Sequence, residues 1–343
     1  MKAIVIHAAK DLRIEDHEHA DPGPGEVLVS VAAGGICGSD LHYFQHGGFG
    51  TVRLRQPMIL GHEVSGHVDR VGADVTGLEE GQLVAISPSR PCQSCRFCHA
   101  GQHNHCLNMR FYGSAMPFPH IQGAFREKLV ADATQCVPAE GLSAGEAAMA
   151  EPLSVCLHAA KQAGDIMGKR VLVTGCGPIG LLVILVARAA GAAEVVATDL
   201  TPFTLQKARE IGADLAVNVA EASDPLSAFQ ADRGHFDVLF ECSGAAAALA
   251  SAVPAMRPGG VIVQLGLGGD MTLPMQAMTA KELEIRGSFR FHAEFPLAVE
   301  MMRKGFIDVS PLITHSFDMK DAVPAFQMAS DRSQAIKAQI RFG

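Results

Sequence analysis

The sequence predicts an α/β protein with two domains, one rich in strands and one built on a doubly wound parallel sheet. At 343 residues the chain is longer than a typical single domain. Its first third carries alternating strands separated by glycine turns, whereas short apolar strands alternate with helices from about Gly141 onward. The hydrophobic content of 48% is sufficient to fill two cores.

The strands of the first third are marked by alternating apolar residues. The stretch 27–32 alternates directly after the turn PGPGE. Two further strands are expected at 62–72 (HEVSGHVDRVG) and 81–86 (GQLVAI). Because long helical periodicity is missing here, we expect this region to be mainly β.

The pattern changes at the alanine-rich stretch 143–164, which predicts a helix with Pro152 near its start. Strands and helices then alternate, and the helix after the second strand has Thr201 as its expected N-cap and Pro202 at its first position. This alternation is typical of a parallel sheet. The expected strands are 170–175, 194–199, 236–244, 261–266 and 282–289, and the expected helices between the first three are 178–192 and 201–213.

The last fifty residues contain two further helical patterns, at 295–305 and 321–330. Both are short and need a partner to pack on. We therefore expect this segment to return to the first domain.

Charge and composition exclude several classes of partner. The formal charge is -8 without a basic block to offset it, which argues against nucleic acid and anionic membranes as partners. The first residues introduce charges too early for a signal peptide. The apolar stretch from Leu181 is too short to span a bilayer and is interrupted by Arg188. We expect a cytoplasmic protein.

Four of the nine cysteines form the pattern C-x2-C-x2-C-x7-C. Four thiolates around Zn²⁺ make a closed, structural site. An iron–sulfur cluster is the alternative, but ferredoxin motifs have their fourth cysteine three residues later, followed by proline, whereas the gap here is seven and Leu107 follows. Nearby histidines are interpreted as solvated residues, although they could substitute as ligands: His99, His103 and His105. The expected zinc ligands are Cys92, Cys95, Cys98 and Cys106.

The stretch VTGCGPIG contains G-x-G-x-x-G between an expected strand and an expected helix. In this context it predicts a dinucleotide site, because the glycines allow close approach of the backbone and the helix N-terminus faces the pyrophosphate. Asp199 ends the next strand, where a carboxylate holds the ribose of NAD and repels the 2′-phosphate of NADP. NAD is therefore the preferred cofactor and NADP remains possible, since Arg209 lies further on. The expected cofactor residues are Gly175, Gly177, Pro178, Ile179, Gly180 and Asp199.

A third set of polar residues is scattered along the chain. Cys37 lies in ICGSDLHY, His62 and Glu63 lie in LGHEVSGHV, and Glu151 lies in AEPL. One thiolate, one imidazole and one or two carboxylates suit an open, catalytic zinc site. Spacing alone does not show that these residues meet, and each alone has an ordinary structural interpretation. Asp40 is interpreted as a cap of a helix or turn.

Together these motifs resemble the zinc-dependent medium-chain dehydrogenases, in the right order over the whole chain. GHEVSGHV, EGQLVAI, the four-cysteine lobe and the glycine turn carry the resemblance. EPLSV and RGSFRF are similar to the polyol (sorbitol) dehydrogenase branch. The resemblance implies a GroES-like catalytic domain at 1–147 and 288–343, with its zinc lobe at about 90–108, and a Rossmann-type cofactor domain at 148–287.

The resemblance also implies roles for single residues. Cys37 and His62 would bind the catalytic zinc, and Glu63 and Glu151 would bind it directly or through water. Ser39 and His42 match a proton relay. The expected substrate contacts are Tyr43, Arg110, Arg290 and Phe291. Phe291 stands where many sorbitol dehydrogenases have tyrosine, which argues against sorbitol as the preferred substrate.

The activity implied is hydride transfer between a nicotinamide cofactor and a secondary alcohol of a sugar acid or polyol. ICGSDLHYFQHG, MRFYGSAMPFPH and IRGSFRF are most similar to members of the branch that oxidise L-idonate to 5-ketogluconate. Its carboxylate needs a cation, for which Arg110 and Arg290 are candidates. Sorbitol, xylitol or L-threonine as substrate, a zinc-free quinone reductase and a non-enzymatic binding protein remain alternatives. The resemblance further implies two zinc ions per chain and a homo-oligomer, either a tetramer or a dimer.

Overall fold

The computed structural model describes residues 1–221 and 223–343 as two compact units. The first unit comprises Met1–Glu151, Phe291–Asp331 and Lys337–Gly343, and the second comprises Pro152–Arg290 and Arg332–Ile336. The sequence placed the changes of domain at 147/148 and 287/288. The compact units divide a few residues later, and they assign the short segment 332–336 to the second unit.

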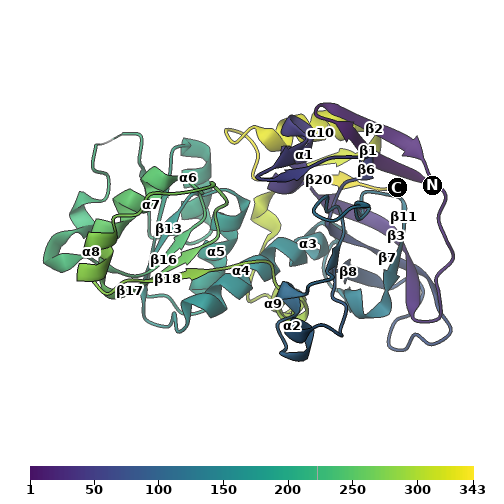
Figure 1. Ribbon diagram of the computed structural model, residues 1–343, viewed down its shortest axis with the longest axis horizontal. Helices are drawn as coiled ribbons and strands as arrows, with labels where there is room; N and C mark the ends of the chain where they lie inside the picture. The colour runs from purple at the N-terminus through teal and green to yellow at the C-terminus, as the bar shows by residue number, and fades with distance from the viewer. Residues whose placement is uncertain (222) are drawn as a thin grey trace. The chain divides into compact units, whose positions relative to one another are not determined.

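The first unit is built on a seven-stranded sheet in the order β12-β8-β7-β3-β20-β19, with β11 also pairing with β3. Its long central strands β3 and β7 pair antiparallel. Both ends of the chain belong to this unit (Figure 1), and its last strand, β20, pairs antiparallel with β3. The strands are β3 (Glu26–Gly35), β7 (Glu63–Val71), β8 (Leu83–Ile86), β11 (Lys128–Asp132), β12 (Cys136–Pro138), β19 (Ile313–Asp318) and β20 (Lys337–Arg341).

Smaller elements surround this sheet. A three-stranded sheet has the order β2-β1-β6, and two ribbons pair β4 with β5 and β9 with β10. The strands are β1 (Lys2–Ala8), β2 (Asp11–Asp16), β4 (Gly48–Phe49), β5 (Val52–Arg53), β6 (Met58–Ile59), β9 (Ser89–Arg90) and β10 (Arg110–Phe111). The helices are α1 (Gly38–His46), α2 (Arg96–His99), α3 (Ala144–Ala148), α9 (Glu294–Arg303) and α10 (Ala322–Ser330).

The core of the first unit joins residues that are far apart in sequence. Phe125 is fully buried, and its ring lies 6.4 Å from that of Phe326 in α10 and 5.9 Å from that of Phe342, measured between centroids. In the C-terminal segment, α10 packs on β19 and β20.

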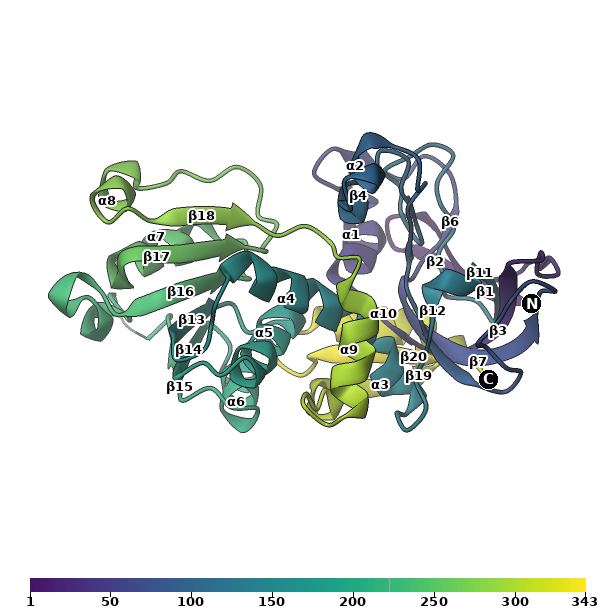
Figure 2. The ribbon, with the colours of Figure 1, turned by 90° about the horizontal axis from the view of Figure 1, so that it is seen from below.

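The second unit contains a six-stranded sheet in the order β15-β14-β13-β16-β17-β18, in which all neighbours are parallel. Figure 2 shows these strands side by side, with β15 and β18 at the edges. The strands are β13 (Arg170–Thr174), β14 (Glu194–Asp199), β15 (Leu215–Asn218), β16 (Phe236–Glu241), β17 (Met256–Gln264) and β18 (Glu284–Gly287). The helices are α4 (Ala150–Ala163), α5 (Pro178–Ala189), α6 (Pro202–Glu210), α7 (Ala246–Ala252) and α8 (Met275–Ala280). The doubly wound topology confirms the predicted fold class.

Two local expectations need correction. The helix predicted over 143–164 is divided into α3 and α4, because α3 ends at Ala148 and its C-cap is Met149. Thr201 occupies the N-cap of α6 as expected, but its side chain makes no capping hydrogen bond. Asp199 instead accepts the backbone N–H groups of Leu200 and Thr201, at 2.7 and 2.9 Å.

We expect Phe125→Ala to lower the free energy of unfolding by about 3–5 kcal/mol, because truncation of a fully buried ring leaves a cavity. Urea denaturation followed by circular dichroism measures this change. Phe306→Ala is the matched control in the same unit, since that ring is 66% exposed and its loss is expected to change stability by less than about 0.5 kcal/mol. Equal effects of the two substitutions would contradict this description of the core.

Candidate functional site

Helix α1 positions the first candidate ligand. Cys37 is its N-cap residue, and the carboxylate of Asp40 accepts the backbone N–H of Cys37 at 3.0 Å in a capping box. Asp40 is fully buried and also accepts the N–H of Gly61 at 3.1 Å. The interpretation of Asp40 as a cap is confirmed, and the same side chain fixes the loop that carries His62.

The structure brings Cys37, His62 and Glu63 together. One potential ligand atom from each lies within 4.8 Å of those of the other two. His62 Nδ1 is buried without a hydrogen-bond partner. The carboxylate oxygen Oδ1 of Asp40 lies 3.8 Å from this nitrogen. A thiol, an imidazole and a carboxylate are a donor set suited to zinc, so these residues fit a metal ion.

The electrostatics of this cluster argue against a free nucleophile. Burial, followed by the charge of Glu63, raises the pKa of Cys37 to about 12. A thiol of this kind stays protonated at neutral pH unless a cation holds its thiolate. Cys37 is therefore better suited to bind a metal than to attack a substrate unaided.

Glu63 has a buried cationic partner. Lys337 Nζ, from β20, lies 2.7 and 2.8 Å from the two carboxylate oxygens of Glu63, and both side chains are almost fully buried. A Cβ on Gly35 would collide with the Glu63 carboxylate. Glycine is therefore required at this position of β3, which explains one member of the pair that precedes ICGSDLHY.

Glu151 lies near this cluster but outside its 4.8 Å limit. It is in the first turn of α4 and is 5% exposed. Burial raises the pKa of Glu151 to about 8, and His62 lowers it while Glu63 and Cys37 raise it. Its carboxyl group thus interacts with the cluster electrostatically.

The expected relay residues lie on α1. Ser39 is half-buried, and its backbone N–H faces the Cys37 sulfur. His42 is exposed, and its ring lies 5.9 Å from that of Phe49. Residues three positions apart share one face of a helix, so the two side chains lie along one face from the cluster to the surface. Tyr43 is buried, and its hydroxyl accepts the N–H of Ala115 at 3.0 Å, which gives it a structural role.

One aromatic neighbour of the cluster has no local sequence signal. The ring of Phe111, in β10, lies 5.5 Å from that of His62. Its neighbour Arg110 lines a cavity together with Arg90 and Arg126. Arg290 has a positive φ of 55° and its guanidinium lies 5.0 Å from the centre of the Phe289 ring. Phe291 is fully buried and stacks on Phe295.

The four cysteines of the C-x2-C-x2-C-x7-C pattern form a second cluster, with sulfur atoms within 4.8 Å of one another. Hydrogen bonds from Ser94 and Asn108 lower the pKa of Cys92 to about 5, which favours a thiolate. Cys98 and Cys106 are buried. His99, His103 and His105 are not members of this cluster among the described residues. The donor set fits one zinc ion: Cys92, Cys95, Cys98 and Cys106.

The glycine motif lies at the C-terminal end of β13 and begins α5. Gly175 has a φ of 86°, and a Cβ on Gly180 would collide with the carbonyl oxygen of Gly175. Gly177 is the N-cap of α5, and Pro178 and Ile179 follow in its first turn. This open helix N-terminus fits a pyrophosphate.

Asp199 closes the same site from the end of β14, where its carboxylate accepts the N–H of Cys176 at 2.6 Å. A second neighbour was not expected from sequence. A Cβ on Gly177 would lie 2.5 Å from Arg332 Nη1, so the guanidinium of Arg332 lies over the glycine turn. Arg332 follows α10 in a segment without a recognisable motif, and only the folded chain reveals its position.

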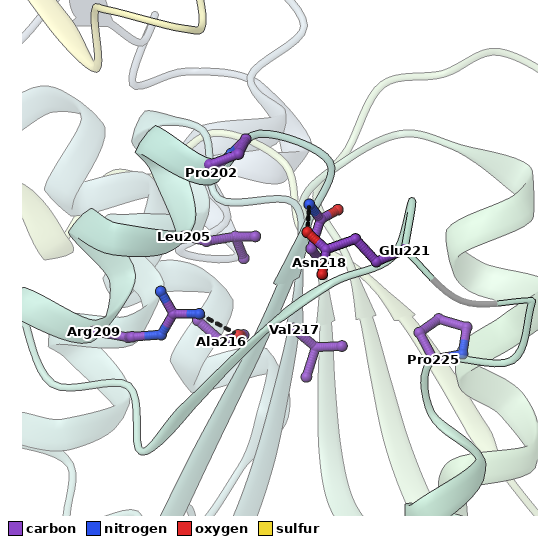
Figure 3. Close-up of a pocket in the computed structure, with 8 residues that line it drawn as sticks. All are labelled: Pro202, Leu205, Arg209, Ala216, Val217, Asn218, Glu221 and Pro225. Carbon is purple, nitrogen blue, oxygen red and sulfur yellow. Dashed lines mark hydrogen bonds between the residues drawn. The ribbon is translucent and has the colours of Figure 1, made fainter.

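A cavity of about 540 Å³ lies beside α6 and the end of β15 (Figure 3). Arg209 donates to the carbonyl oxygen of Ala216 at 2.8 Å in this cavity, and Asn218 donates to Glu221 at 2.7 Å. Asn218 is the register partner of Asp199. The cavity therefore adjoins the strand end that carries Asp199.

Among the described residues, no helix combines the length and the apolar character needed to cross a bilayer.

Comparisons with known proteins agree with this geometry. Residues 23–144 match the family model of the alcohol dehydrogenase GroES-like domain, and residues 178–304 match that of the zinc-binding dehydrogenases. The chain is 44% identical over 318 residues to L-idonate 5-dehydrogenase (NAD(P)(+)) of Escherichia coli strain K12, covering 92% of each chain. It is 38% identical over 336 residues to human sorbitol dehydrogenase, covering 95% of this chain and 91% of that one.

A solved structure shows the same relationship. The crystal structure of L-idonate 5-dehydrogenase from Escherichia coli K-12 matches with a TM-score of 0.95 and 41% identity, over 99% of this chain and 98% of that chain. These matches extend over both units. The chain therefore belongs to the zinc-binding alcohol dehydrogenase family, as an NAD(P)-dependent oxidoreductase that acts on CH–OH groups.

Proposed function

We propose that the protein interconverts L-idonate and 5-ketogluconate by hydride transfer to and from a nicotinamide cofactor. The observation that carries this proposal is the 44% identity, over 92% of both chains, to a protein named for this reaction. A polyol dehydrogenase acting on sorbitol or xylitol is the second candidate, favoured by the 38% identity to sorbitol dehydrogenase.

In the proposed active site Cys37, His62 and Glu63 hold zinc, and Glu151 completes the set directly or through water. Zinc bound there supplies a Lewis acid that polarises the substrate oxygen. Asp40 fixes the backbone next to His62 by accepting the N–H of Gly61, and Lys337 holds the carboxylate of Glu63. Ser39 takes or gives the proton of the substrate hydroxyl, and His42 exchanges it with water.

The glycine turn and α5 hold the pyrophosphate of the cofactor, with Gly175, Gly177, Pro178, Ile179 and Gly180 forming the cradle. Asp199 accepts hydrogen bonds from the adenosine ribose and disfavours the 2′-phosphate of NADP. Arg209, the arginine that could accept a 2′-phosphate, donates to the carbonyl oxygen of Ala216. NAD is therefore the proposed cofactor, with NADP as a weaker alternative.

The substrate carboxylate requires a cation, and Arg290 is the proposed one, because the other candidate, Arg110, lines the cavity with Arg90 and Arg126. Tyr43 and Phe291 are both buried, so they shape the site from below its surface. We place the enzyme in the cytoplasm, because reduced cysteines suit metal binding there. We also propose that it forms a homo-oligomer.

A substrate screen tests the proposed function. We expect NADH oxidation to be faster with 5-ketogluconate than with fructose, xylulose or 2-amino-3-ketobutyrate, because the proposed site is suited to a carboxylate. With 5-ketogluconate, we expect NADH to be oxidised faster than NADPH, because Asp199 repels the 2′-phosphate. Activity confined to fructose and xylulose would replace the idonate proposal with the polyol one. If Arg290→Ala leaves the KM for 5-ketogluconate unchanged, that arginine does not bind the carboxylate, whereas a raised KM in Arg110→Ala would assign Arg110 to the substrate site.

Metal analysis separates the two cysteine clusters. We expect two zinc ions per chain in the wild type and one in both Cys37→Ser and Cys98→Ser, because each substitution removes a ligand from a different cluster. Cys37→Ser should lower kcat by at least about 100-fold with an unchanged thermal midpoint, since its metal acts in catalysis. Cys98→Ser should lower the thermal midpoint, because a closed zinc site contributes to folding.

Mass spectrometry of the native protein counts the ions, and differential scanning calorimetry measures the midpoints. A wild type with one zinc ion would restrict metal binding to the four-cysteine cluster. A Cys37→Ser variant that retains two ions and full activity would sink the proposed catalytic site.

We expect Arg332→Gln to weaken NADH binding by about tenfold, because a guanidinium over the glycine turn loses its charge-assisted contacts with the pyrophosphate. Fluorescence titration of NADH gives the dissociation constant without turnover. Arg257→Gln is the control in the same unit, since Arg257 pairs with Asp237 instead. An unchanged dissociation constant in Arg332→Gln would exclude this contact.

A further inference from the structure

A second cavity lies wholly within the first unit, at the ribbon β9–β10. Its volume is about 220 Å³, and three arginines line it: Arg90, Arg110 and Arg126. Three guanidinium groups around one cavity repel one another, and in a chain of formal charge -8 such a concentration of positive charge is unusual. The cavity therefore requires an explanation in terms of a negative partner.

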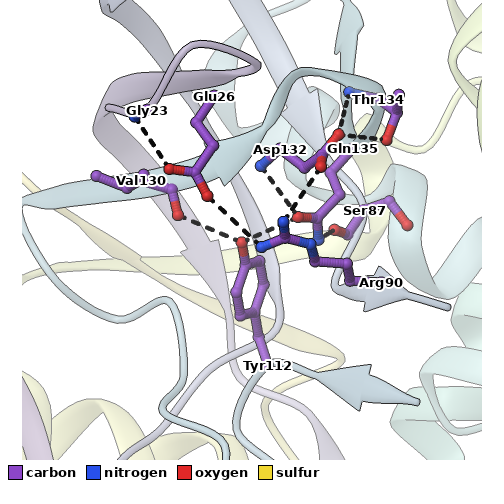
Figure 4. Close-up of polar contacts among 9 residues, drawn as sticks. All are labelled: Gly23, Glu26, Ser87, Arg90, Tyr112, Val130, Asp132, Thr134 and Gln135. Atoms are coloured by element: carbon purple, nitrogen blue, oxygen red, sulfur yellow. Dashed lines mark hydrogen bonds and ion pairs between the residues drawn. The ribbon is translucent and has the colours of Figure 1, made fainter. Parts of the chain in front are cut away.

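Carboxylates of the protein compensate only one of these arginines. Arg90 pairs with Glu26 at 3.6 Å and with Asp132 at 3.4 Å, and Figure 4 shows its guanidinium between the two. Arg110 is the register partner of Arg90 across the ribbon, a position at which like charges destabilise a sheet. Within residues 1–221 and 223–343, neither Arg110 nor Arg126 forms an ion pair with a carboxylate.

Arg126 is the least exposed of the three arginines. Its side chain is half-buried, and its Nε donates to the carbonyl oxygen of Gly123 at 2.9 Å. Burial lowers the pKa of Arg126, which reflects the cost of keeping its charge away from water. The two terminal nitrogens form a fork that matches a carboxylate or a phosphate in shape.

Neutral side chains complete the lining. Gln122 uses its side-chain oxygen to accept the N–H of Ile59 at 2.8 Å, which leaves its amide N–H groups as donors. The hydroxyl of Tyr112 donates within the protein, to the carbonyl oxygen of Val130 and to Gln135 Oε1. His120 accepts the N–H of Arg55 with Nε2 and contacts the carbonyl oxygen of Pro117 with Nδ1. Gln122 is therefore the neutral residue of the lining that offers a donor to a ligand.

This cavity and the zinc cluster lie on opposite faces of β10. Successive side chains of a strand point to opposite faces, so Phe111, which contacts His62, points away from Arg110 and Tyr112. A molecule bound among the arginines would therefore lie on the face of β10 opposite to the one that contacts the proposed metal ligands.

We propose that the arginine cavity is a binding site for a small oxyanion, distinct from the substrate site. Arg110 and Arg126 bind its oxygens, Gln122 donates a further hydrogen bond, and Arg90 adds positive charge at the rim. Carboxylate and phosphate share this recognition chemistry, and the site accepts a small metabolite that carries either group.

The test uses the full-length, zinc-loaded protein saturated with NADH, so that the pyrophosphate site is filled. Calorimetric titrations with inorganic phosphate and with acetate are compared with sodium chloride at matched ionic strength. We expect saturable binding of phosphate, of acetate or of both, and the stronger of the two identifies the preferred group. Binding no stronger than that of chloride would overturn the proposal.

Variants locate the site. Arg126→Gln and Arg110→Gln should each weaken anion binding by at least about tenfold, because each removes charge-assisted hydrogen bonds. Arg53→Gln is the matched control, since that exposed arginine of the same unit donates only to the carbonyl oxygens of Gly50 and Val52. Because Arg110 is exposed, its variant remains informative if Arg126→Gln does not fold. Unchanged binding in Arg110→Gln would overturn the proposal.

Kinetics separates this site from the substrate site, independently of which sugar the enzyme reduces. Phosphate that competes with the best ketose or keto-acid substrate would place the anion in the active site and overturn the proposal of a distinct site. A KM for 5-ketogluconate that rises in Arg126→Gln, with that for xylulose unchanged, would do the same. Inhibition or activation that is not competitive supports two sites.

Discussion

The buried ion pair between Glu63 and Lys337 is the interaction on which the arrangement of the first unit depends. The two residues are 274 positions apart, and each is almost fully buried. Burial alone would lower the pKa of Lys337, but the charges of Glu63 and Cys37 raise it. Removal of either partner would leave an uncompensated buried charge, which typically costs about 3–5 kcal/mol.

This pair also explains why the chain returns to its first unit. Strand β20 lies beside β3, and it places Lys337 next to the loop that carries Cys37, since Lys337 Nζ also approaches the carbonyl oxygen of Ile36 at 3.3 Å. The glycine of β3 at position 35 leaves space for the Glu63 carboxylate. The cluster of Cys37, His62 and Glu63 is thus assembled beside a sheet that contains β20.

Sequence reasoning succeeded where the determining contacts are local. The four-cysteine cluster and the glycine turn are each formed by residues close together in sequence, and the alternation of strands and helices predicted the parallel sheet correctly. Cys37, His62 and Glu63 were grouped through a family resemblance, because no local pattern shows that residues on α1 and β7 meet.

Contacts over long sequence separations escaped prediction. Lys337, Phe111 and Arg332 lie next to candidate site residues, yet each comes from a segment without a motif of its own. Arg110 illustrates the same limit. Its charge suggested a contact with the substrate, but its neighbours in the cavity, Arg90 and Arg126, are known only once β9, β10 and the segment before β11 are folded together.

The positions of these cations have a common physical logic. A chain with a formal charge of -8 repels anions at long range, and its proposed cofactor and substrate are both anionic. Screening limits such repulsion to roughly 8 Å at physiological ionic strength, so charges within contact distance decide binding. Arg332 at the glycine turn and the arginines of the β9–β10 cavity provide that local charge. Lys337 does not, because it forms an ion pair with Glu63. The enzyme can therefore be acidic overall and still bind anions, because these arginines supply positive charge where an anion would bind.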